Sequence, residues 1–141
     1  HRDEAQEILQ EYFYRGINRA VINKHVVGDL VKFYGVKGSP FFHWFFPFER
    51  GHVMQDYGVD IDLTKERKLD EAKLKEYCEH ACEELNVMIY GGDCIVGPDG
   101  KITIIDFNDW PSYAPCSNEA APHIAKSVLA EIKEFISKRE K

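Results

Sequence analysis

The spacing of apolar residues along the chain predicts three amphipathic helices. From residue 3 to about residue 16, apolar residues recur three and four positions apart, acidic residues occupy the first turn, and Gly16 ends the run. A similar spacing predicts a helix from Asp70 to about Leu85, with Tyr77 and Leu85 among its inward-facing residues. A third helix is predicted from about Ala120 to Lys138.

β-branched and aromatic runs occupy the stretches between these helices. Residues 19–36 contain two apolar runs separated by Gly28-Asp29, which predicts a strand, a bend and a second strand. A turn at Gly38-Ser39-Pro40 leads into an aromatic extended segment over residues 41–48, and residues 51–68 are predicted to form an exposed connection. The order of elements predicts an α+β fold in which an antiparallel sheet is flanked by helices.

A hairpin over residues 91–111 is the centre of the predicted sheet. Gly97-Pro98-Asp99-Gly100 has the composition of a tight turn between antiparallel strands. If these four residues are unpaired, Asp93 lies opposite Ile104. Side chains alternate between the faces of a strand. One face of the second strand would then carry Ile102, Ile104, Asp106 and Asn108, and the other Thr103, Ile105 and Phe107.

This register brings Asp93, Asp106 and Asn108 to one patch of the sheet, with the two acids about 7–8 Å apart between backbone positions. Carboxylates this close repel each other unless a cation lies between them. Hard oxygen ligands suit Mg²⁺ or Mn²⁺, which complete their shells with water and substrate phosphates. We therefore predict a metal–nucleotide site. The alternative is that these are ordinary solvated polar residues, although an unpaired carboxylate inside the apolar strand around Asp106 would be costly.

The hairpin resembles the metal-binding hairpin of the ATP-grasp superfamily, in particular its D-alanine–D-alanine ligase branch. In that branch the first acid precedes the second by thirteen positions and an asparagine follows two positions later, the intervals that separate Asp93, Asp106 and Asn108. Asp106 stands where the family more commonly has glutamate. The resemblance extends over about residues 19–115 and implies the C-terminal lobe of an ATP-grasp fold.

The resemblance also implies nucleotide contacts in the segment before the hairpin. The backbone of residues 22–26 would contact adenine, Asp29 would bind the ribose, and Lys32 would offset phosphate charge as a catalytic residue. Asp29 is alternatively a plain turn residue, and the Lys32 side chain alternatively reaches out to water. The candidate nucleotide-binding residues are Asn23, Lys24, His25, Val26, Asp29 and Lys32.

The activity implied by the resemblance is that of an ATP-dependent carboxylate–amine ligase, or a related ligase, acting through an acyl phosphate with Mg²⁺ or Mn²⁺. An ATP-dependent small-molecule kinase of the same fold and a non-catalytic nucleotide- or metal-binding domain are the alternatives. The acceptor would be a small molecule that the residues do not identify. The family's preceding lobe, with its glycine-rich phosphate loop, is not visible in the sequence. We therefore expect a fragment of a longer protein that is inactive without its N-terminal lobe.

Length, charge and composition exclude several other classes of protein. A length of 141 residues suits a single domain, and a net charge of −6 without a basic patch argues against nucleic-acid binding. No apolar run approaches the roughly 20 residues that span a bilayer. The start lacks a signal-peptide pattern, and the four cysteines lack the spacing of a zinc site. Free thiols indicate a reducing compartment, so we predict a cytoplasmic protein.

Overall fold

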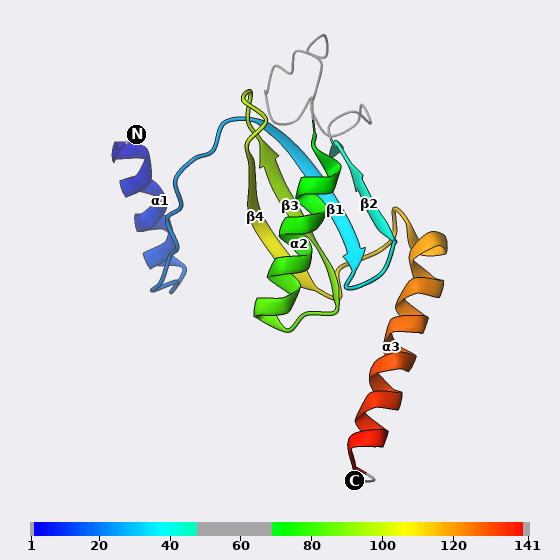
Figure 1. Cartoon of the computed structure of the whole chain (residues 1–141). Helices are drawn as coiled ribbons and strands as arrows, with labels where there is room; N and C mark the ends of the chain where they lie inside the picture. The colour runs from blue at the N-terminus through cyan, green and yellow to red at the C-terminus, as the bar shows by residue number, and fades with distance from the viewer. Residues whose placement is uncertain (1, 48–68, 140–141) are drawn as a thin grey trace.

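The computed structural model describes residues 2–47 and 69–139, and these residues form an α+β fold (Figure 1). The connection expected over residues 51–68 lies outside the described residues. The elements, in chain order, are α1 (Arg2–Tyr14), β1 (Asp29–Val36), β2 (Phe42–Phe45), α2 (Glu71–Leu85), β3 (Ile89–Val96), β4 (Ile102–Asp109) and α3 (Ser117–Arg139). The predicted helices and the central hairpin are therefore confirmed.

The four strands form one antiparallel sheet in the order β2-β1-β3-β4. β1 and β3 are the interior strands and pair with each other, so side chains of β1 lie next to side chains of the central hairpin. α2 covers one face of this sheet (Figure 1). We call that face the helix side and the other face the open side.

α2 begins and ends at capping residues. The Asp70 carboxylate accepts a hydrogen bond from the Lys73 backbone N–H at 3.0 Å, and Asn86 ends the helix in the left-handed conformation with φ 53°. Leu74, Cys78 and Cys82, spaced four residues apart, are buried against the sheet.

The prediction that Tyr77 and Leu85 also face inward is wrong, because Tyr77 is 40% and Leu85 60% exposed. Each follows a buried residue by three positions, which places it about 60° around the helix from the buried line. The stripe of α2 residues that contacts the sheet is therefore narrower than the apolar stripe predicted from the sequence.

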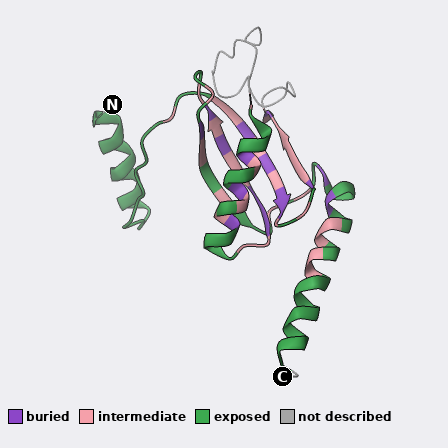
Figure 2. Ribbon diagram, viewed as in Figure 1, coloured by how far each residue is buried: buried purple, intermediate pink, exposed green. Residues whose placement is uncertain are grey.

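The core on the helix side is continuous from α2 to all four strands. Phe33 and Tyr90 are both fully buried, and their ring centroids lie 6.5 Å apart. Figure 2 shows the buried residues concentrated in the sheet, and the buried residues of α2 pack against them. The buried members of this core are Val31, Phe33, Phe46, Leu74, Cys78, Cys82, Tyr90, Cys94, Val96 and Ile102.

The first of the two strands predicted over residues 19–36 is absent. Residues 17–27 have no regular structure and mostly exposed side chains, and β1 begins at Asp29. None of the described strands pairs with residues 19–27, so their β-branched composition has no ladder of hydrogen bonds to join. The β propensity of residues 19–27 was therefore not sufficient to form a strand.

The N-terminal end of α3 packs against the end of β1 and the turn that follows it. Ala120 is buried with Val36 and Phe41, and His123 Nδ1 lies 2.8 Å from the Ser39 hydroxyl oxygen. The rest of α3 extends away from the sheet, and α1 has no buried residues (Figures 1 and 2). The apolar stripes that predicted these helices are therefore largely exposed in the described chain.

Gly92 lets β4 approach β3 closely. A Cβ atom at this position would overlap the carbonyl oxygen of Asp106 and lie 2.9 Å from the Phe33 ring. We predict that Gly92→Ala lowers the free energy of unfolding by about 1–3 kcal/mol, because a backbone atom must move. Urea denaturation measures this, with Ile105→Ala at a 52% exposed position as the control. The control should change stability by about 0.5 kcal/mol or less, and an equal effect of both variants would contradict the close approach.

Buried thiols should make the fold sensitive to alkali. Burial raises the pKa of Cys82 and of Cys94 from 9.0 to about 12. Between these pH values the unfolded chain releases thiol protons that the native chain keeps, so the free energy of unfolding should fall as pH rises. The slope approaches about 1.4 kcal/mol per pH unit for each such thiol. Urea denaturation from pH 8 to pH 11 should therefore show a shallower slope for Cys94→Ala than for the unsubstituted chain, and an unchanged slope would contradict this.

Candidate cation and phosphate site

A β-bulge in β4 places the two candidate acids directly opposite each other. Asp93 pairs with Asp106, whereas the next residue of β3, Cys94, pairs with Ile104. Ile105 is therefore the extra residue of the bulge. The predicted register, with Asp93 opposite Ile104, is wrong by this insertion, and the loop is also longer because Val96 pairs with Ile102.

The bulge also changes which residues of β4 share a face. Ile104 and Phe107 both pack against the helix-side core, while Ile105 is 52% exposed. Asp106 and Asn108 are exposed on the open side. The prediction that Ile102 and Ile104 share a face with Asp106 is thus wrong, as is the grouping of Ile105 with Phe107. Strict alternation does not continue through a bulge.

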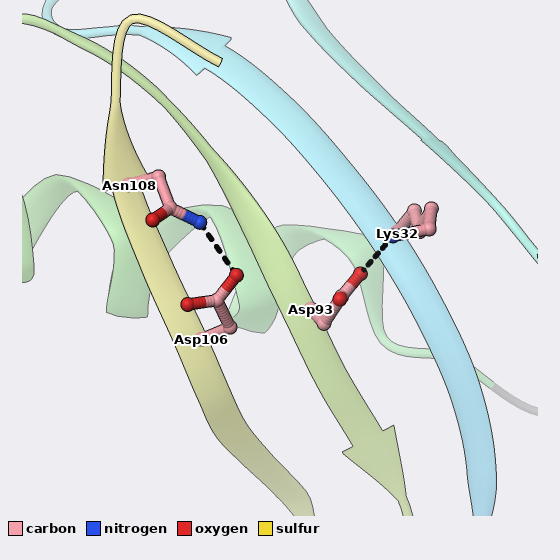
Figure 3. A network of polar contacts seen from close by, with 4 residues as sticks. All are labelled: Lys32, Asp93, Asp106 and Asn108. Carbon is pink, nitrogen blue, oxygen red and sulfur yellow. Dashed lines mark hydrogen bonds and ion pairs between the residues drawn. The ribbon is translucent and has the colours of Figure 1, made fainter. Parts of the chain in front are cut away.

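Three charged side chains form a row across the open side of the sheet (Figure 3). Lys32 on β1 pairs with Asp93 on β3, and Asp93 pairs with Asp106 on β4. The Lys32 Nζ lies 2.8 Å from Asp93 Oδ1, with side chains 39% and 23% exposed. The sequence predicted that Lys32 and the two acids serve one metal–nucleotide site, and the sheet brings them together. We call Lys32, Asp93 and Asp106 the charged row.

The second carboxylate has a different partner. The Asn108 carboxamide nitrogen donates a short hydrogen bond to Asp106 Oδ2, two positions back along β4. In Figure 3 the Asp93 carboxylate is joined to Lys32 and the Asp106 carboxylate to Asn108. Like charges opposite each other destabilise a sheet, and these two contacts give each carboxylate a donor of its own.

The two acids of the charged row and Asn108 carry oxygen atoms of the kind that bind a magnesium-type cation. The described part of the chain contains no cluster of three or more His, Cys, Asp or Glu side chains suited to a metal. Mg²⁺, however, is commonly held by only one or two protein carboxylates together with water and phosphate. Asp93 and Asp106 supply the two carboxylates, and rotation of the Asn108 carboxamide would present its oxygen in place of its nitrogen.

Aromatic side chains border the charged row on the side of β1 and β2. Tyr34, two residues after Lys32, stacks on Phe45 with centroids 6.3 Å apart and lies 5.5 Å from the Tyr113 ring. The Tyr113 hydroxyl oxygen lies 2.7 and 2.8 Å from the carbonyl oxygens of Gly35 and Tyr90, which share its single proton. Burial raises the pKa of Tyr34 and of Tyr113. The Tyr34 side chain thus lies on the same face as Lys32, and burial keeps both phenols protonated at neutral pH.

These two tyrosines were not among the predicted site residues. Alternation from Lys32 already placed Tyr34 on the same face, which is a signal that sequence reasoning could have used. Tyr113 lies in the loop between β4 and α3, and nothing in its local sequence indicates that its hydroxyl contacts the backbone of both β1 and β3.

The candidate adenine and ribose residues do not join this cluster. Asn23, Lys24 and His25 are exposed and Val26 is half-buried in the irregular segment before β1. Asp29 is the first residue of β1, opposite Val96, and alternation along the strand assigns it to the face opposite Lys32. Of the predicted nucleotide-binding residues, Lys32 alone lies with Asp93, Asp106 and Asn108 in the described structure.

Comparisons of the chain with models of protein families, with curated proteins and with solved structures find no significant match. None of the described helices has both the length and the apolar character needed to cross a bilayer. The function must therefore be argued from the site.

Charge removal at Asp93 should lower stability at low salt, whereas charge removal at Asp106 should not. Asp93→Asn leaves the Lys32 ammonium without its partner and should lower the free energy of unfolding by about 1 kcal/mol. Asp106→Asn removes a like charge opposite Asp93 and should leave stability unchanged or raise it by about 0.5 kcal/mol. Urea denaturation at low and at high salt measures both, and the difference should shrink as salt screens the charges. A larger loss for Asp106→Asn would contradict this arrangement of charges.

Proposed function

We propose that this chain is the metal-binding C-terminal lobe of an ATP-grasp enzyme, most consistent with an ATP-dependent carboxylate–amine or related ligase. The observation that carries the proposal is the placement of Lys32, Asp93, Asp106 and Asn108 on one open face of an antiparallel sheet. The thirteen-residue interval between the acids adds support from the sequence. ATP and an unidentified small-molecule acceptor would be the ligands, with an N-terminal lobe completing the site.

The charges of the site suit a nucleotide polyphosphate carried with a cation. Asp93, Asp106 and Asn108 would hold Mg²⁺ or Mn²⁺, which neutralises phosphate charge when bound. Lys32 is a flexible point charge beside these acids and would contact a phosphate oxygen of the bound ligand. The chain's own contribution is to position and to neutralise, which is most of what phosphoryl transfer requires of a protein.

The position of the site opposite the core supports a functional role for it. α2 and the larger core cluster are packed on the helix side, a smaller cluster around Val36 packs against α3, and no buried charged residue is found among the described residues. The charged row is therefore not needed to satisfy a buried polar group. Stability and ligand binding can be separated experimentally for this reason.

Asp106→Asn should weaken divalent-cation binding strongly while the fold is retained. Loss of an outer-shell partner of a metal typically costs about 10–100-fold in affinity, so loss of a carboxylate ligand should cost at least about tenfold. Titration with Mn²⁺ followed by electron paramagnetic resonance measures this, and calorimetry with Mg²⁺ and a non-hydrolysable ATP analogue tests the nucleotide. Asp109→Asn removes the same charge from an exposed residue at the end of β4 and serves as the control.

The outcomes separate the alternatives. Nucleotide binding that requires the cation and is lost in Asp106→Asn supports the ATP-grasp proposal, whether the enzyme is a ligase or a small-molecule kinase. Nucleotide binding that is indifferent to the cation favours a non-catalytic nucleotide-binding domain. Cation binding without nucleotide favours a plain metal-binding module. Equal cation affinity in Asp106→Asn, Asp109→Asn and the unsubstituted chain overturns the proposed ligand set.

A further inference from the structure

Lys32 forms a contact that a bound cation would have to break. Its ammonium lies 2.8 Å from Asp93 Oδ1, and Asp93 is the middle residue of the charged row. The ammonium thus holds the carboxylate that the proposed site requires for a divalent cation. Asp106, on the far side of Asp93, is hydrogen-bonded to Asn108 instead.

We propose that Lys32 is a built-in counter-ion that a divalent cation displaces from Asp93, and that the displaced ammonium then becomes available to a phosphate group arriving with the cation. This inference rests on the proposed function and adds to it an exchange of partners within the site. It also gives Lys32 two successive roles, first toward Asp93 and then toward the ligand.

The side chain is suited to such an exchange. Lysine is a compact charge on a flexible stem and, unlike arginine, does not hold a carboxylate through a rigid two-point contact. The Lys32 side chain is 39% exposed, so water and a ligand can reach it beside Asp93. A partly exposed ion pair is weak enough for a divalent cation to replace it.

The exchange reverses the charge of the site. With Lys32 as the counter-ion, the charged row contains two carboxylates and one ammonium and has a net negative charge. This charge disfavours the binding of phosphate. A divalent cation added to the row makes the net charge positive, which favours phosphate. Cation and polyphosphate should therefore each increase the affinity of the other, as any coupling of binding free energies requires. The site would reject free polyphosphate and accept its metal complex.

Substitution of Lys32 should change the two affinities in opposite directions. Lys32→Met removes the competitor of the cation, so the affinity for Mn²⁺ alone should rise by about 5-fold or more. It also removes the phosphate contact, so the affinity for the Mn²⁺ complex of inorganic tripolyphosphate should fall by a similar factor. Electron paramagnetic resonance measures the first affinity, and calorimetry measures the second. Lys101→Met removes the same charge from the exposed hairpin turn and should change neither.

Stability measurements keep the test independent of folding defects. Lys32→Met leaves the two acids of the row without a cationic neighbour, so its thermal midpoint should fall, and Mn²⁺ should raise that midpoint more than it raises that of the unsubstituted chain. Lys32→Gln, which retains a hydrogen-bond donor beside Asp93, provides a second variant if Lys32→Met is too unstable to assay.

The results distinguish failure of this inference from failure of the proposed function. If the unsubstituted chain binds Mn²⁺ through Asp106 but Lys32→Met and Lys32→Gln bind it equally or more weakly, the exchange is overturned and the metal site stands. If the unsubstituted chain, Lys32→Met and Lys32→Gln all fail to bind Mn²⁺, both are overturned. Opposite changes in the two affinities support both.

Discussion

One additional residue in β4 determines how the two faces of this sheet are used. Without Ile105 in a bulge, Ile104 and Asp106 would project to the same side, and either an apolar residue would leave the core or a carboxylate would enter it. The bulge directs Ile104 and Phe107 to the helix side and Asp106 to the open side. Together with the longer turn after Val96, it places Asp106 directly opposite Asp93. The core and the candidate site therefore depend on the same local irregularity.

The close approach of two like charges is made tolerable by neighbours on both sides. Asp93 has the Lys32 ammonium across one strand pair, and Asp106 has the Asn108 carboxamide along its own strand. The same two donors are the ones that a cation bound at the row would have to replace, which is the exchange that we propose.

The core on the helix side contains ionisable groups that stay neutral. The thiols of Cys78, Cys82 and Cys94 and the Tyr90 hydroxyl are buried there, and burial raises the pKa of each. The Tyr113 hydroxyl ties the loop after β4 to the backbone of the two interior strands. Together these contacts hold the strands that carry Lys32, Asp93 and Asp106 in a fixed relation.

The amino-acid sequence by itself determined the helices and the hairpin. Alternation along β1 and β3 also determined that Lys32 and Asp93 lie on one face of the sheet, and that Val31, Phe33 and Cys94 lie on the other. These follow from periodicity and capping, which act over a few residues. It misplaced the register of Asp106 because a bulge is selected by packing on the far face, and it predicted a strand over residues 19–27 because propensity does not reveal whether a partner strand exists. Only the tertiary structure paired β1 with β3, and so joined a lysine and an aspartate 61 positions apart in the chain. That contact depends on sheet order, which local sequence does not encode.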